Sequence, residues 1–187
     1  MKRNTILLMG FSLITVLFYS FMSRERTNSV GQLVQYSCTP CGAECDKALF
    51  EKGGICTQCN MALVDKSTIS HKNIQPAAMC TLDTRKVIFL DVRTPAEFNG
   101  TAEAKFGAIK NAINIPVQEL ENRMNELEKY KDIEIVVYCS HSRRSPRASY
   151  MLTQKGFKHV TNMEGGMSVW KELVKQNDCN EKLYKSQ

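Results

Sequence analysis

Short apolar runs alternate with segments of helical spacing from about residue 74 to residue 176. Apolar runs of strand length occur at 87–92, 112–115, 133–138 and 159–161. Helical patterns lie between and after them, at 95–98, 117–127, 145–155 and 166–174. A regular alternation of strands with helices is typical of a parallel sheet covered by helices, with ligands at the carboxyl ends of the strands. The pattern therefore predicts an α/β domain over residues 67–176.

The first residues form a different kind of segment. Residues 6–22 contain no charged side chain and follow Lys2 and Arg3. This run is long for the core of a signal peptide and at the short end for a membrane span. We expect residues 1–23 to be an uncleaved membrane anchor, with a cleaved signal peptide as the alternative, and residues 24–35 to be a polar linker. The main domains are then extracytoplasmic, in the periplasm, and either anchored to the membrane or secreted.

Residues 36–66 hold five of the eight cysteines and too few apolar side chains for a core of their own. Two Cys-x-x-Cys pairs stand 14 residues apart: Cys38 with Cys41, and Cys56 with Cys59. Four thiolates at this spacing can meet on one tetrahedral ion, and sulfur ligands suit zinc or another soft metal. Disulfides remain the alternative in an oxidising compartment. Cys45 is left as a fifth ligand, a reactive thiol or half of a disulfide.

The remaining composition adds limits. The net charge is +6, and the basic residues are mixed with acidic ones and form no stripe interleaved with aromatics, which argues against a nucleic-acid partner. Cys80 follows Ala77, Ala78 and Met79 in an apolar helical pattern, and we expect it in the core. Residues 177–187, which include Cys179, are expected to be a loose polar tail.

One strand ends in a cysteine at a point where chemistry is favoured. The apolar run before Cys139 is followed by a polar and basic loop composed of Ser140, His141, Ser142, Arg143, Arg144 and Ser145. Ser145 is the expected N-cap of the next helix, with Pro146 at its first position. Loop amides, the helix dipole and two arginines all stabilise negative charge. Cys139 is therefore a candidate nucleophilic thiolate for an anionic substrate.

Several motifs in order make residues 68–175 resemble a single-domain rhodanese. They are Phe89-Leu-Asp-Val-Arg-Thr-Pro-Ala-Glu-Phe98, Ala112-Ile-Asn-Ile-Pro116, Tyr138-Cys139 with Arg143-Arg-Ser145, Gly156-Phe157, and Glu164-Gly-Gly-Met167 with Trp170. The resemblance implies a sulfurtransferase that moves sulfane sulfur from thiosulfate or a persulfide donor to a thiol or another thiophilic acceptor. By this resemblance Cys139 carries the persulfide and needs no cofactor, residues 140–145 bind the substrate, Arg93 contributes to binding, and Asp91 gives structural support.

The size of the loop separates this family from its relatives. Four residues separate Cys139 from Arg144, as in sulfur-transferring rhodaneses, whereas the related cysteine phosphatases have five. A cysteine phosphatase or arsenate reductase is therefore a minor alternative. Two departures are visible. The family commonly has glycine where Ser142 stands, and the segment between Phe98 and Gly107 is longer than usual, so it is expected to shape access to Cys139.

The cysteine-rich segment also resembles a known module. Tyr36-Ser-Cys38-Thr-Pro-Cys41 and Gly54-Ile-Cys-Thr-Gln-Cys-Asn-Met61 are similar to the small heavy-metal-binding domain of metal-efflux proteins. In that family a histidine stands where this chain has Cys41, and the methionine at Met61 is shared. This resemblance leaves open a non-enzymatic protein that binds a soft metal or a partner through its cysteine pairs.

Overall fold

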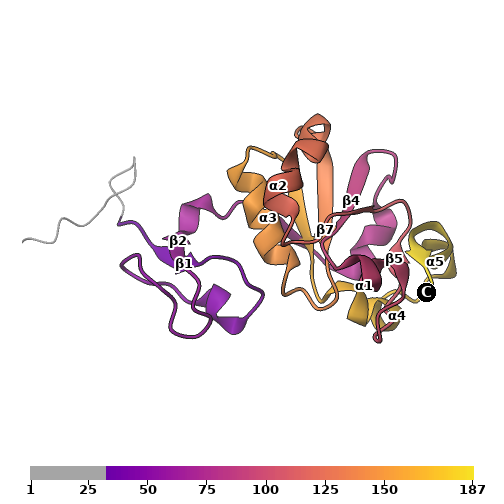
Figure 1. The fold of residues 1–187 in the computed structure, drawn as a ribbon, viewed down its shortest axis with the longest axis horizontal. Coiled ribbons are helices and arrows are strands. Elements are labelled where there is room, and N and C mark those ends of the chain that lie inside the picture. The colour runs from indigo at the N-terminus through magenta and orange to yellow at the C-terminus, as the bar shows by residue number, and fades with distance from the viewer. Residues whose placement is uncertain (1–32) are drawn as a thin grey trace, which may run out of the picture.

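The computed structural model describes residues 33–187, and the expected anchor or signal peptide at 1–23 lies outside them. The described chain has two parts (Figure 1). A small cysteine module covers residues 33–65, and an α/β domain follows. Within residues 33–187, no helix has the length and apolar character that crossing a bilayer requires.

The elements of the module are short. They are β1 (Tyr36–Cys38), η1 (Glu44–Lys47) and β2 (Leu63–Asp65), followed in the connection by η2 (Lys66–Thr68). β1 and β2 pair antiparallel, with Cys38 opposite Leu63. The buried interior consists of three cysteines, Cys38, Cys45 and Cys56, with a few partly buried apolar side chains around them. Sulfur atoms therefore take the place that aliphatic side chains fill in an ordinary core.

The α/β domain contains the remaining elements. Its strands are β3 (Lys72–Ile74), β4 (Val87–Asp91), β5 (Ala108–Ile109), β6 (Ile113–Asn114), β7 (Glu134–Tyr138), β8 (Val160–Met163) and β9 (Tyr184–Lys185). Its helices are η3 (Pro76–Thr81), α1 (Pro95–Asn99), α2 (Leu120–Arg123), η4 (Met124–Tyr130), α3 (Ser145–Gln154), η5 (Gly166–Val169), α4 (Trp170–Leu173) and α5 (Asn177–Leu183). The helix expected at 117–127 is thus split between α2 and the 3-10 turns of η4.

The main sheet has the strand order β3-β8-β7-β4-β6, and every neighbouring pair is parallel. This confirms the predicted α/β architecture with a parallel sheet. β7 lies at the centre, between β4 and β8, so the loop after it stands in the middle of the carboxyl edge. That position is where parallel sheets bind their ligands.

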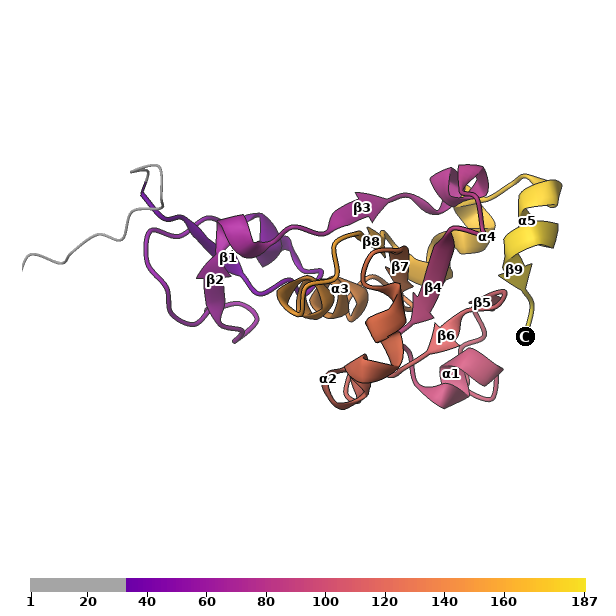
Figure 2. The same ribbon diagram turned by 90° about the horizontal axis from the view of Figure 1, so that it is seen from above.

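Alternation along β7 divides the core into two layers. Ile135 and Val137 face the layer that contains Leu120 from α2 and Leu152 from α3. Val136 and Tyr138 face the opposite layer, which is covered by η3, η5, α4 and α5. Figure 2 shows α2 and α3 on one side of the sheet and α4 and α5 on the other. Because successive strand residues point to opposite faces, Cys139 belongs to the α2 and α3 layer.

The expectation of a loose tail at 177–187 is wrong. α5 and β9 pack onto the α/β domain, where Cys179 and Leu183 are buried and β9 pairs with β5. Cys179 forms a disulfide with Cys80 across a sequence separation of 99 residues. The polar composition of the segment concealed this, because only two of its side chains supply buried contacts. Cys80 is therefore a disulfide partner and not a simple core residue.

Candidate active site and cysteine cluster

Cys139 directly follows the last residue of β7 and is fully buried, with its thiol facing the loop of residues 140–145. Burial by itself raises the pKa of Cys139. Hydrogen bonds from the Ser145 hydroxyl, whose oxygen is 3.4 Å from Sγ, and from the amides of Ser145, Arg144 and His141 outweigh this effect. The pKa of Cys139 is therefore lower than that of an ordinary thiol. Ser145 is the first residue of α3 rather than its N-cap, because its side chain is directed at this thiol.

Backbone amides of η5 hold the chain at Cys139 and Ser140 in place. The amide of Met167 donates to the carbonyl of Cys139 at 2.9 Å, and the amide of Ser168 donates to that of Ser140 at 2.9 Å. Gly166 makes this approach possible, because a Cβ there would lie 2.5 Å from the Cys139 carbonyl oxygen. With these carbonyls turned away and satisfied, the loop amides are free to face the sulfur.

Arg144 is held by a carboxylate that the sequence analysis did not single out. Its guanidinium donates two hydrogen bonds of 2.7 Å to Glu97, and the Ser140 hydroxyl donates a third to Glu97 at 2.8 Å. Glu97 also closes the capping box of α1 with Thr94. The Arg144 ion pair holds the pKa of Glu97 far below its usual value. Arg144 therefore orients the loop, and much of its charge is already compensated.

Arg93 does not reach the loop, contrary to its expected role in substrate binding. Its side chain is fully buried, forms an ion pair with Asp91 at 2.6 Å and lies over the ring of Tyr138. It also donates to the carbonyl of Gly107 at 2.9 Å. The chain bends at Arg93, and the side chain of Arg93 runs alongside that of Asp91 into the core. Asp91 has the supporting position expected of it.

The outer part of the loop is open to solvent. His141 and Arg143 are exposed, and His141 makes an edge-to-face contact with Phe106 at a ring separation of 5.1 Å. Phe106 belongs to the enlarged segment before Gly107, which thus borders the loop as expected. Ser142 adopts a left-handed backbone with φ of 52°, which explains why glycine suits this position. The structure therefore brings residues 139–145 together and leaves Arg93 apart.

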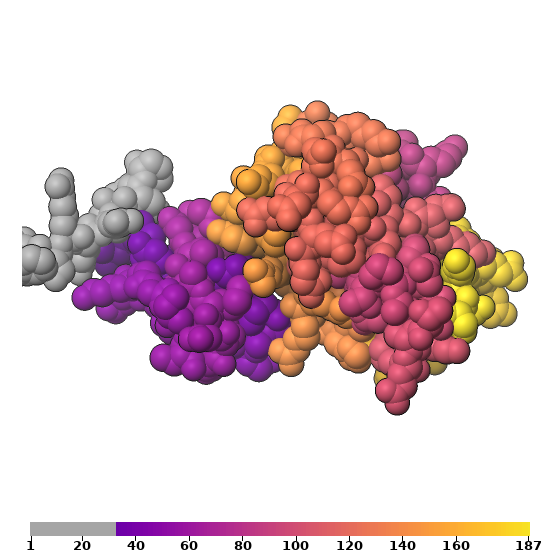
Figure 3. Space-filling model, in the orientation of Figure 1, coloured from indigo at the N-terminus to yellow at the C-terminus, as the bar shows by residue number. Residues whose placement is uncertain are grey.

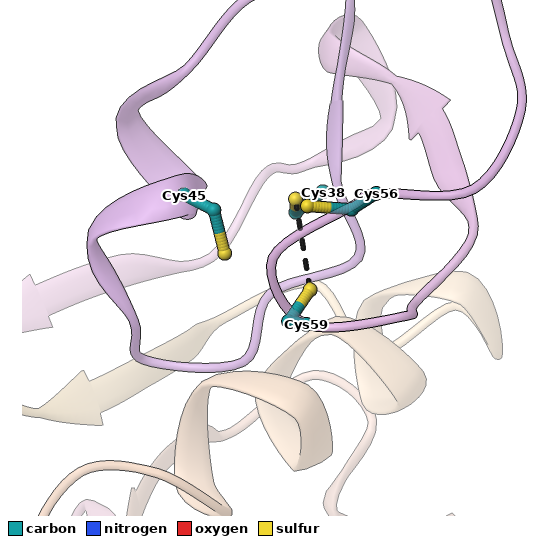
Figure 4. A group of neighbouring side chains, drawn as sticks. All are labelled: Cys38, Cys45, Cys56 and Cys59. Atoms are coloured by element: carbon teal, nitrogen blue, oxygen red, sulfur yellow. Dashed lines mark hydrogen bonds between the residues drawn. The ribbon is translucent and has the colours of Figure 1, made fainter.

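The four cysteines that converge are not the four that the spacing predicts. The thiols of Cys38, Cys45, Cys56 and Cys59 lie within 4.8 Å of one another (Figure 4). Cys45 from η1 replaces the expected Cys41. Cys41 instead lies beside Cys45 and Asp46, with its thiol 3.2 Å from the Asp46 carboxylate. The two Cys-x-x-Cys pairs predicted the site but not its fourth member, because the Cys41 thiol contacts Cys45 and Asp46 at the edge of the cluster.

The chemistry of this set fits a metal ion. The sulfur atoms of Cys38 and Cys59 are 3.8 Å apart, and a tetrahedral zinc site with Zn–S bonds of about 2.3 Å places its sulfurs about 3.8 Å apart. Burial raises the pKa of Cys38, and the hydrogen bond from Cys38 lowers that of Cys56 to about 6. Neighbouring thiols thus share protons here. A cation would allow all four to ionise together, so these residues would hold zinc or a similar soft ion.

Two residues that support the site, Glu97 and Gly166, were not identified by the sequence analysis. Glu97 was part of a quoted motif, and its place three residues after Thr94 is the signature of a capping box, but nothing local showed that it would reach Arg144. Gly166 stood in a second quoted motif, and its role depends on the close approach of two distant segments. Both roles are tertiary, so spacing alone could not reveal them.

The α/β domain is similar to proteins of a known family. The model of the rhodanese-like domain matches residues 78–173. A sulfurtransferase of Allochromatium vinosum is 36% identical over 88 residues, which are 47% of this chain and 75% of that protein. A putative mitochondrial thiosulfate sulfurtransferase of Schizosaccharomyces pombe is 34% identical over 103 residues, a match that covers 49% of this chain and 68% of that protein.

The chain is also similar to part of a larger protein and to proteins of solved structure. A tRNA uridine(34) hydroxylase of Cronobacter sakazakii is 31% identical over 90 residues, which cover 46% of this chain and 24% of the hydroxylase. The solved structure of a rhodanese-related protein from Thermoplasma volcanium is 34% identical, covers 55% of this chain and 92% of that one, and superposes with a TM-score of 0.47. These matches span about half of the chain.

Proposed function

Because the chain belongs to the rhodanese-like family, we propose that it is a sulfurtransferase that carries sulfane sulfur as a persulfide on Cys139. The observation that carries this proposal is the thiol at the carboxyl end of β7, whose pKa is lowered by the surrounding loop amides and the Ser145 hydroxyl. A lowered pKa supplies thiolate at neutral pH, and the same donors stabilise the anionic outer sulfur of a persulfide.

The reaction proceeds in two displacements. The Cys139 thiolate attacks the outer sulfur of thiosulfate, the bond between the two sulfur atoms of the donor breaks, and sulfite leaves with the electron pair. A thiolate acceptor then attacks the outer sulfur of the Cys139 persulfide, and Cys139 is released as thiolate. A persulfide donor reacts in the same way with a thiolate as the leaving group. The exposed Arg143 is positioned to attract the anionic donor.

The compensated charge of Arg144 favours sulfur transfer over phosphate or arsenate chemistry. Glu97 accepts two hydrogen bonds from the Arg144 guanidinium, so much of the positive charge of Arg144 is neutralised. The Glu97 carboxylate would also repel a phosphate dianion held within the loop. The Cys139 persulfide that sulfur transfer forms in the loop carries a single negative charge, which needs less compensation from Arg144.

The test is mass analysis of the full-length protein after incubation with thiosulfate. We expect an added mass of one sulfur atom that maps to the peptide of Cys139, together with sulfite release. The Cys139→Ser variant is expected to gain no sulfur and to lose turnover by on the order of 10³-fold or more. A protein that never gains sulfur from thiosulfate or from an organic persulfide, or a variant that keeps full turnover, refutes the proposal.

A second candidate is a soft-metal protein, supported by the convergence of Cys38, Cys45, Cys56 and Cys59. The two candidates differ in the variant that abolishes function. Metal delivery would depend on Cys38 and Cys56 and be unaffected by Cys139→Ser, whereas sulfur transfer shows the reverse dependence on Cys139. Metal content per chain, measured on the protein as purified, decides whether zinc or another soft ion occupies the cluster.

We also propose an extracytoplasmic location. The disulfide between Cys80 and Cys179 supports it, because disulfides persist in oxidising compartments. The uncharged run at residues 6–22 would export the rest of the chain and serve as its membrane contact. A reporter fused after residue 187, active only in the periplasm, tests the orientation. A signal confined to the cytoplasm would refute it.

A further inference from the structure

The cysteine module lies directly against the back of the sulfur-binding loop. A Cβ built on Gly42 would lie 1.9 Å from the carbonyl oxygen of Ser142 and 3.1 Å from Cα of Arg143. Figure 3 shows the indigo surface of the module in contact with the orange surface that includes this loop. The turn at Gly42, between two cysteines of the module, therefore touches the peptide that joins Ser142 to Arg143.

This peptide is the most strained point of the loop. Ser142 holds a left-handed backbone conformation that is unfavourable for a residue other than glycine. Its own side chain gives weak support, since its contacts with the Met163 carbonyl and with the Asn162 amide are both 3.4 Å long. The close approach of Gly42 therefore adds a steric limit on the position of the Ser142 carbonyl.

The position of this peptide bears on the thiol because the next amide along the chain, that of Arg144, is one of the donors to Cys139. A trans peptide is planar, so the N–H of Arg143 points away from the side on which the Ser142 carbonyl meets Gly42. The module therefore contacts the carbonyl end of this peptide, and the amide of Arg143 points away from the module. Rotation of this peptide would turn a carbonyl toward the loop interior, where negative charge must be stabilised.

Gly42 is itself held in position by the metal-binding part of the module. Its amide donates to the Asp46 carboxylate at 2.7 Å, and the amide of Cys41 donates to the same group at 2.9 Å. Asp46 follows Cys45, one of the four converging cysteines, within η1. Farther along, Gln154 of α3 donates to the carbonyl of Thr68 at 2.9 Å, which fastens the connection to the domain.

We propose that Gly42, held by Asp46, is a positioning residue for the sulfur-binding loop, so that the module tunes the reactivity of Cys139. The proposal rests on the proposed sulfur transfer for its catalytic consequence, but the reactivity of the thiol is a separate quantity. A metal ion in the cluster would strengthen this coupling by fixing η1.

The test compares Gly42→Ala with Gly54→Ala in the full-length protein. Gly54 belongs to the same module, and a Cβ there meets nothing within 4 Å. Alkylation of Cys139 by iodoacetamide is followed across pH by peptide mass analysis, alongside thiosulfate turnover and bound metal. In Gly42→Ala we expect a higher pH midpoint of Cys139 alkylation and turnover reduced about ten-fold, whereas Gly54→Ala should match the parent in every readout.

A parent-like alkylation profile in Gly42→Ala overturns the proposal. If that variant fails to fold or loses its metal, Asp46→Asn decides, because it leaves Gly42 unchanged and weakens the acceptor that holds the amides of Cys41 and Gly42. We then expect a smaller shift of the midpoint in the same direction, and an unchanged midpoint overturns the proposal. A shifted midpoint in a protein whose parent shows no sulfur transfer would refute the proposed function while leaving this inference in place.

Discussion

In the α/β domain Cys80 and Cys179 are joined in a disulfide, whereas the five cysteines of the cysteine module are free thiols. The domain also has two apolar layers around its sheet, whereas the hydrophobic cluster of the module has three cysteines as its buried members, with a few partly buried neighbours. The difference teaches that one chain uses sulfur in two ways. In the domain it adds a covalent link to a core that already exists, and in the module it replaces the core.

This contrast also bears on the environment of the protein. Thiols that lie 3.8 Å apart in an oxidising compartment are expected to oxidise unless a cation holds them as thiolates. The coexistence of a closed disulfide with a cluster of free thiols is therefore consistent with a module that binds metal before it meets oxidant.

The largest expected effect comes from Cys56→Ser, which removes one of the four converging thiols. Structural zinc contributes apparent binding energies of about 10–16 kcal/mol, so its loss should unfold residues 36–65. Metal analysis and hydrogen exchange are expected to show no bound ion and an exposed module, with β7 still protected. Cys41→Ser is the matched control and should keep its metal. Metal that stays in Cys56→Ser contradicts the four-thiol site, and metal that leaves in Cys41→Ser contradicts the assignment of Cys45 as the fourth ligand.

The second effect concerns the domain alone. Replacing both Cys80 and Cys179 by serine should lower its free energy of unfolding by about 2–5 kcal/mol, because the link closes a loop of 99 residues. Denaturant unfolding followed by the fluorescence of Trp170 measures this directly. That indole is buried and donates to Asn180 of α5 at 2.8 Å, so it reports on the linked segment. The metal content of the module should not change, and a loss of metal would break the comparison.

A smaller effect is expected from Glu97→Gln. The variant loses the charged partner of Arg144, and we expect the domain to be destabilised by about 1–3 kcal/mol. Because the pKa of Glu97 is lowered in the folded protein, its contribution is present above the unfolded value of about 4.3 and disappears as the pH falls through the lower folded value. The stability difference between parent and variant should therefore shrink in acid. The exposed pair of Glu126 with Arg123 supplies the control, since Glu126→Gln should change stability little.

The smallest expected effect concerns the difference in pKa between the thiols of the cysteine module and the thiol of Cys139. Burial raises the pKa of Cys38, whereas loop donors lower that of Cys139. We expect the alkylation rate of Cys139 to fall with decreasing pH around a midpoint below about 8.5, the value of a free thiol. Ser145→Ala should raise this midpoint by a fraction of a pH unit, because one donor is lost. A parent midpoint at or above that of free cysteine would count against thiolate stabilisation by the loop.

Much of the α/β domain could be predicted from its sequence, because hydrophobic periodicity and the positions of proline and glycine are local signals. The run ending at Tyr138 predicted β7, and the helix expected at 145–155 is observed as α3, although Ser145 is its first residue and not its N-cap. The predictions that failed depended on the direction of a side chain or on partners far away in the sequence. Arg93 was expected at the substrate because its motif says nothing of side-chain direction, yet its pairing with Asp91 draws it into the core.

The cysteines show the same limit. Spacing indicated a four-sulfur site, but the choice of Cys45 over Cys41 depends on the turn at Gly42 and on Asp46. The pairing of Cys80 with Cys179 required knowledge that α5 returns to η3, and no local pattern carries that information.

The disulfide gives the domain a property that its sheet alone would not have. The link begins before β4 and closes after α4, so β4, β6, β7 and β8 and the loop of Cys139 all lie within one covalent ring. A single cut by a protease in the exposed segment between Phe98 and Gly107 would therefore open the ring without separating its ends. The two fragments would separate only after reduction, so a nicked chain would keep its halves, and the loop of Cys139, together.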